Sequence, residues 1–149
     1  MDNGNGAYKQ FFEGIPCYVT VQSRELQLVA ANSLFRKDFG NGVGSYCYEV
    51  YKGRTDKCPV CPVEKTFADG RIHRSEEIIR RRNGEEVVVI VFSAPIRDEQ
   101  GNIIAAVEAS TGFTPYRPKR EQVPAELQPV LNTCRSIYER LYARRLRSD

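Results

Sequence analysis

The sequence predicts an α+β protein in which a five-stranded antiparallel sheet carries a helical flap across one face. Two short strand-like segments come first, a stretch with three cysteines and two prolines occupies residues 44–70, and three longer strand-like segments follow. The last three are separated by glycine-containing turns at residues 83–84 and 98–102. Because short turns join antiparallel strands, these segments predict one small sheet, and the irregular cysteine stretch predicts the flap.

Size and composition fit one globular domain with an accessory segment. The chain has 149 residues, of which 41% are hydrophobic, and its net charge is +3. This charge is too small to indicate a nucleic-acid partner. No apolar run approaches the roughly 20 residues of a membrane span, and the N-terminus lacks the pattern of a signal peptide. We therefore expect a cytoplasmic chain without a membrane span in it.

The first half predicts two strands between short helices. Residues 1–7 are polar and glycine-rich and predict disorder, and residues 7–13 predict a helix with aromatic side chains on one side. Residues 17–22 alternate as a half-buried strand does, and residues 26–31 form its hairpin partner. Asn32 is placed to cap a helix over residues 33–39.

The second half predicts two further helical segments and three strands. Residues 47–51 predict a helical turn, and residues 63–68 predict a helix that ends at Gly70. Strands are expected over residues 72–82, 86–96 and 103–111, with a type I′ turn at Asn83-Gly84 and a bulge near Pro95. Residues 87–92 are apolar on both faces, which predicts a central strand covered on both sides.

The C-terminal segment predicts a linker and a helix. Pro115, Pro118 and Pro124 mark the linker, and a helix is expected from about Pro124 to Arg147. Its apolar residues repeat at roughly heptad spacing, which predicts a dimer seam. The seam residues are Leu127, Leu131, Cys134, Ile137, Tyr138 and Leu141.

The order of elements and several short motifs resemble a PAS domain. The motifs are FFEGIP at residues 11–16, LVAAN at residues 28–32 with Phe35, and the closing hairpin from Gly84 to Thr114. CYEVY at residues 47–51 and CP-x-CP at residues 58–62 resemble a cysteine-bearing subgroup found in bacterial and archaeal sensor histidine kinases. The resemblance covers residues 8–114, and residues 115–149 would then be the linker and a signalling and dimerisation helix.

By this resemblance the chain is a sensory module of a two-component type signal-transduction system and not an enzyme. The family commonly holds a small ligand or cofactor between sheet and flap, dimerises, and signals through a C-terminal helix. The partner would be an output kinase or regulator domain of the same or another chain, so the sequence is either an excised piece or a stand-alone module. One departure is Gly112-Phe113-Thr114, where many PAS domains have an acidic residue in an Asp-Ile-Thr-like triplet that joins the core to the output helix.

Cys47, Cys58 and Cys61 have the spacing C-x10-C-x2-C and carry the most distinctive chemistry of the chain. Thiolates at C-x2-C spacing can hold a metal ion or an iron–sulfur cluster, with Cys17 or His73 as a fourth ligand. The same thiols can instead form a disulfide, exchange with a partner disulfide, or remain inert. The residues leave these alternatives open.

Other residues narrow the choice of cofactor. Thioether-linked haem needs C-x-x-C-H, and Pro62 stands where the histidine would be. The residues around Cys47 differ from the flavin-binding photosensory motif Asn-Cys-Arg-Phe-Leu-Gln, so a flavin is not expected. Glu108, within the last predicted strand, is a candidate to face a ligand pocket. A ligand-free dimerisation domain with a filled core is the remaining alternative.

Overall fold

The computed structural model describes residues 3–112, 124–138 and 140. Five strands form one antiparallel sheet in the order β2-β1-β5-β4-β3. They are β1 (Tyr18–Gln22), β2 (Leu28–Ala31), β3 (His73–Arg80), β4 (Glu86–Arg97) and β5 (Ile103–Gly112). This sheet with its helices confirms the α+β fold class.

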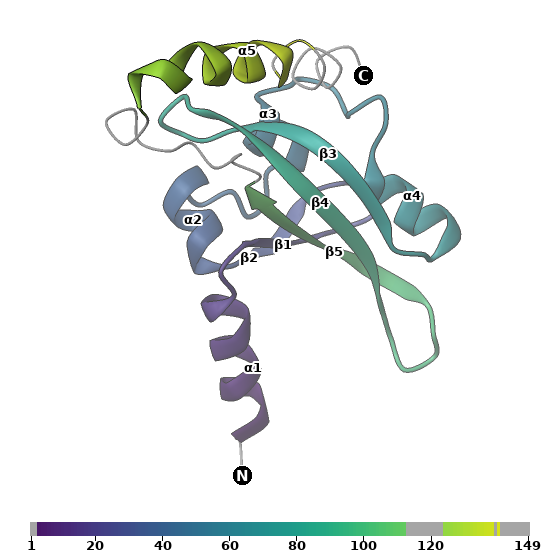
Figure 1. The fold of residues 1–149 in the computed structure, drawn as a ribbon. Coiled ribbons are helices and arrows are strands. Elements are labelled where there is room, and N and C mark those ends of the chain that lie inside the picture. The colour runs from purple at the N-terminus through teal and green to yellow at the C-terminus, as the bar shows by residue number, and fades with distance from the viewer. Residues whose placement is uncertain (1–2, 113–123, 139, 141–149) are drawn as a thin grey trace.

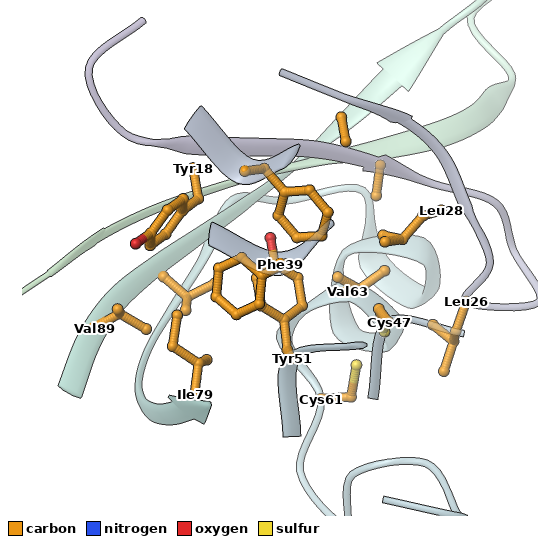
Figure 2. Close-up of a cluster of buried hydrophobic side chains, with 14 residues drawn as sticks. Tyr18, Leu26, Leu28, Phe39, Cys47, Tyr51, Cys61, Val63, Ile79 and Val89 are labelled. Atoms are coloured by element: carbon orange, nitrogen blue, oxygen red, sulfur yellow. The ribbon is translucent and has the colours of Figure 1, made fainter. Parts of the chain in front are cut away.

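Three short helices cover one face of the sheet, which we call the inner face (Figure 1). They are α2 (Ser33–Phe39), α3 (Cys47–Lys52) and α4 (Pro62–Asp69). Aromatic rings join α2 and α3 to β1: Phe39 packs against Tyr18 with ring centroids 5.1 Å apart, and against Tyr51 at 5.2 Å (Figure 2). Helix α4 is fixed to β4 by a buried hydrogen bond from the Thr66 hydroxyl to the Ser93 carbonyl.

Asn32 connects three parts of the chain and is fully buried. Its Oδ1 accepts from the backbone N–H of Phe35, which caps α2 as predicted, and from that of Val19 in β1, both at 3.2 Å. Its Nδ2 donates to the carbonyls of Cys17 at 2.9 Å and Ile15 at 3.3 Å. One side chain therefore caps a helix and fixes the segment that leads into the sheet.

The Asn83-Gly84 hairpin forms, but the predicted type I′ turn is wrong. Gly84 has φ +87°, whereas Asn83 does not have a positive φ. The Gly84 N–H donates to the Arg81 carbonyl, and the Arg81 N–H donates to the Glu85 carbonyl, both at 2.9 Å. This is the longer hairpin loop in which a type I turn is followed by one left-handed glycine, so only Gly84 needs the left-handed conformation.

The prediction that β1 is half-buried is wrong, because four of its five residues are buried, and the polar side of the strand faces inward. Thr20 and Gln22 have no exposed surface and lie on the inner face with Tyr18. The expectation that β4 is covered on both sides is wrong for the described part of the chain, because Phe92 on the outer face is 48% exposed. Periodicity gives the two faces of a strand, but it does not say which face the helices cover.

The N-terminal helix is longer than expected. Helix α1 spans Asn3–Gly14 and so includes part of the segment predicted to be disordered. Its C-terminal end is anchored because Glu13 accepts from Arg36 of α2 at 2.9 Å. From an anchored end, each further helical residue adds one backbone hydrogen bond, which extends the helix towards the N-terminus.

The C-terminal helix is described only in part. A 3₁₀ turn, η2 (Ala125–Leu127), leads into α5 (Gln128–Tyr138), and Pro129 lies in its first turn. Leu127, Cys134 and Ile137 of the predicted seam are exposed, while Leu131 and Tyr138 lie within α5. Leu141, the linker prolines Pro115 and Pro118, and Phe113-Thr114 fall outside the described residues. None of the described helices combines the length and apolar character that a membrane span requires.

We expect Asn32→Ala to lower the free energy of unfolding by about 2–4 kcal/mol, because it removes a helix cap and leaves several buried backbone groups without partners. Urea denaturation followed by circular dichroism measures the change. Asn41→Ala, at an exposed position, is the matched control and should change stability by less than about 0.5 kcal/mol. A loss below that control value for Asn32→Ala would contradict the connecting role of Asn32.

Candidate functional site

A cavity of about 30 Å³ lies between the inner face of the sheet and the segment that runs from α3 into α4. This volume has room for one or two water molecules. Helices α3 and α4 with their connecting loop supply one wall, and β3, β4 and β5 supply the other. The lining side chains include Cys47, Tyr51, Lys52, Cys58 and Cys61 from the helical side, and Glu77, Val91, Glu108 and Ser110 from the sheet.

The fold brings Cys47, Cys58 and Cys61 to this one cavity, and all are free thiols. Cys47 begins α3 and Cys61 directly precedes α4, so both are buried in the core (Figure 2). Cys58 lies in the loop between the helices and is partly exposed. Burial raises the pKa of Cys47 far above its usual range and raises the pKa of Cys61 to about 11. Both buried thiols are therefore protonated at neutral pH.

The other predicted metal ligands lie elsewhere. Neither Cys17 nor His73 lines the cavity, and His73 Nε2 is 3.0 Å from Asp69 Oδ1. Within the described ranges, no group of three or more His, Cys, Asp or Glu side chains is placed to hold a metal ion. The metal or cluster site therefore gains no support from the geometry and stays a prediction.

Glu108 faces the cavity from β5, although a surface position was the simpler expectation for a strand carboxylate. Its side chain is buried, with 8% of the residue exposed. Burial raises the pKa of Glu108 to about 7, and the nearby Glu77 carboxylate adds to the increase, while Lys52 and Tyr51 oppose it. Both protonation states of this buried carboxyl are therefore populated near neutral pH.

Lys52 and Glu77 form a salt bridge across the cavity that sequence reasoning missed. It joins the end of α3 to β3, and both side chains are mostly buried. Burial alone would lower the pKa of Lys52, but the hydrogen bond and charge of Glu77, with a smaller effect of the nearby Cys58, outweigh it and raise that pKa. Because half of the positions in β3 are charged, only the strand register distinguishes Glu77 as an inner-face residue.

The inner face carries more polar groups than a dry core would. Thr20, Gln22, Ser93, Glu108 and Ser110 are all buried there. Three of their oxygens, Gln22 Oε1, Ser93 Oγ and Ser110 Oγ, have no hydrogen-bond partner. Buried polar atoms without partners are rare, and they commonly mark positions where water or a ligand binds.

The strand order β2-β1-β5-β4-β3, the helices on the inner face and the cavity between helices and sheet are those of a PAS domain. The family described as PAS fold matches residues 12–116, and the chain belongs to it. This confirms the resemblance seen in the sequence. No curated protein matches the chain.

Solved structures of PAS and light-oxygen-voltage domains share the fold. The LuxR-type receptor VqmA of Vibrio cholerae aligns with a TM-score of 0.59 at 17% identity, over 74% of this chain and 51% of that one. The PAS domain of an HTR-like protein from Haloarcula marismortui aligns with a TM-score of 0.59 at 16% identity, over 73% of this chain and 91% of that one. A Rhodobacter sphaeroides LOV protein aligns with a TM-score of 0.61 at 16% identity, over 97% of this chain and 99% of that one. The chain thus spans about half of VqmA, and identities this low establish the fold alone.

The raised pKa of Glu108 predicts a pH-dependent stability cost. An unfolded glutamate loses its proton near pH 4.5, while the folded one keeps it to about pH 7, so this residue makes the free energy of unfolding fall as pH rises between these values. Glu108→Gln removes that cost. The stability of Glu108→Gln relative to the natural chain should rise by roughly 2–3 kcal/mol between pH 4.5 and pH 8.

Urea denaturation of both proteins at several pH values measures this difference. Glu99→Gln, an exposed residue in the β4–β5 turn, is the control and should show a constant difference from the natural chain. A constant difference for Glu108→Gln as well would show that the carboxyl is not held in a low-dielectric cavity.

Proposed function

We propose that the chain is a sensory module that binds a small polar ligand in the cavity beneath α3 and α4, and that binding is the input of a two-component type signalling system. Five free cysteines fit a reducing compartment such as the cytoplasm. The observation that carries the proposal is the polar inner face, where Glu108 and three unpartnered oxygens are buried. It favours a ligand-binding domain over a ligand-free dimerisation domain, whose core would be apolar and filled.

The donors and acceptors of the cavity indicate the chemistry of the ligand. Glu108 donates a hydrogen bond when protonated and accepts one when ionised, and the Ser110 hydroxyl does either. Lys52 is already paired with Glu77, so the described lining offers no unpaired positive charge for a large anion. A small neutral molecule with both hydrogen-bond donors and acceptors fits this arrangement.

The size of the cavity links binding to movement. A ligand larger than one or two water molecules requires α3, α4 and their connecting loop to move away from the sheet. Polar contacts that hold these helices in place include the Lys52–Glu77 salt bridge, the hydrogen bond from Thr66 to Ser93 and the one between Tyr51 and Thr20. A ligand that binds the displaced arrangement better shifts the population towards it, which is the thermodynamic basis of a signal.

The output is proposed to pass through α5 in a dimer. Leu127 at the end of η2, and Val130 and Ile137 in α5, are 49%, 57% and 43% exposed, which is a large apolar surface for so short a segment. The parallel helix of a second copy would cover these residues in a short heptad seam. The receiving partner in this proposal is a kinase or regulator domain, and the module itself performs no catalysis.

Native mass spectrometry tests ligand binding. Protein purified gently and without oxygen should carry an added mass that disappears on denaturation. Ser110→Val removes a cavity hydroxyl and adds volume, so the added mass should fall at least about tenfold in occupancy. Thr111→Val, the next residue and on the exposed outer side of β5, is the control and should keep the mass. Protein without any added mass, purified from several growth conditions, would count against ligand binding.

Sedimentation equilibrium tests the dimer seam. Ile137→Glu places a charge on the exposed apolar side of α5 and should weaken dimerisation by about tenfold or more. Ser136→Glu adds the same charge at the neighbouring exposed position and should have little effect. Equal dissociation constants for the two variants would exclude the seam.

A further inference from the structure

The three cavity thiols differ in how a solvent-borne reagent can reach them. Cys47 and Cys61 are 8% and 7% exposed, whereas Cys58, in the loop before α4, is partly exposed. A small molecule that enters from solvent therefore meets Cys58 first. Cys61 lies three positions further along the chain, the C-x2-C spacing at which two sulfurs readily join.

Lys52 gives Cys58 the surroundings of a reactive thiol. Lys52 and Cys58 line the same cavity, Lys52 at the end of α3 and Cys58 in the loop that follows it, so the ammonium that pairs with Glu77 lies in the surroundings of this thiol. Reactive cysteines are found at partly exposed positions next to a cation, because the cation stabilises the thiolate that acts as the nucleophile. Cys47 and Cys61 line the same cavity but are buried, so Cys58 alone of the three cavity thiols combines this position with exposure to solvent.

Cys61 has the features of a second, resolving thiol. It immediately precedes α4, and the positive end of a helix dipole stabilises negative charge at this position when the sulfur reacts. Burial shields Cys61 from direct attack, so it reacts with a sulfur already present at Cys58.

We propose that Cys58 and Cys61 form a dithiol that is oxidised to an intramolecular disulfide by a low-molecular-weight disulfide, and that this exchange regulates the sensor cavity. This inference rests on the proposed function, since it places a redox input in the same cavity. Closing the disulfide ties the loop to the start of α4, and this change acts on the helices that cover the cavity.

The exchange balances in two steps. The Cys58 thiolate attacks one sulfur of the small disulfide, forms a mixed disulfide, and releases one thiolate, which takes up the proton that Cys58 lost. The Cys61 thiolate then attacks the Cys58 sulfur, forms the Cys58–Cys61 bond, and releases the second thiolate, which takes up the Cys61 proton. Two cysteine thiols are oxidised, and one small disulfide is reduced to two thiols.

The test exposes the reduced full chain to 2-hydroxyethyl disulfide, stops the reaction by alkylation and maps the products by peptide mass spectrometry. Cys58 should react about tenfold faster than the more exposed Cys134, and a Cys58–Cys61 linked peptide should accumulate. Cys61→Ala should stop the reaction at the mixed disulfide on Cys58, and Cys58→Ser should abolish the linked peptide. Circular dichroism of each variant verifies that it is folded.

Lys52→Met should slow the first step about fivefold or more. Lys57→Met, which lies in the loop with Cys58 but is paired with Glu64, should not. A Cys47–Cys61 product, or a Cys58 that reacts no faster than Cys134, would overturn the inference. Because this readout detects thiols and not a bound molecule, it is independent of the mass measurement on Ser110→Val. A Cys58–Cys61 disulfide in a chain that never carries a ligand would contradict the proposed function but still support the dithiol exchange.

Discussion

The burial of a carboxyl group on the inner face of the sheet is the constraint on which the rest of this structure depends. Glu108 lies beneath α3 and α4, and its neighbours in the same layer are hydroxyl and amide side chains. Such a surface is stable only if each polar group finds a partner, because an isolated buried group costs roughly 1–3 kcal/mol. The helices must therefore supply polar partners, and water or a ligand must supply the rest.

The contacts between helices and sheet follow from this requirement. Tyr51 brings a hydroxyl within 3.1 Å of Thr20, Thr66 bonds to the Ser93 carbonyl, and Lys52 pairs with Glu77. Apolar packing alone would hold the helices in one position. Polar contacts across a small cavity can be exchanged for contacts to a ligand, so they favour movement of α3 and α4 relative to the sheet. Cys47, Cys58 and Cys61 lie in these helices and their connecting loop, so a disulfide between two of them would act on the same helices.

Much of the fold could be predicted from the sequence because its signals are local. Asn32 before an apolar helix, Gly70 after one, and the turn residues between the last three strands each determine structure within a few positions. The turn at Asn83-Gly84 was predicted at the right place with the wrong geometry, since two hairpin loops share that dipeptide. The start of α1 was misplaced because the anchor of that helix, Arg36, lies far along the chain.

The site was less predictable because it depends on register between distant segments. The spacing of Cys47, Cys58 and Cys61 identified the helical side of the cavity, and Glu108 was a candidate for the other side. Lys52 and Glu77 carry no local signal, since lysines and glutamates are common on exposed helices and edge strands. The alternation of β1 placed Thr20 and Gln22 on one face without saying which face is buried, and only the complete sheet shows that the helices cover their side.

A high-resolution crystal structure of the reduced chain, grown without oxygen, tests the central claim that the polar inner face is built to hold a non-protein group. The account predicts electron density for a ligand or ordered water within hydrogen-bond distance of Glu108 and Ser110. Density confined to protein atoms, with Gln22, Ser93 and Ser110 bonded to other side chains around a closed interior, would contradict it.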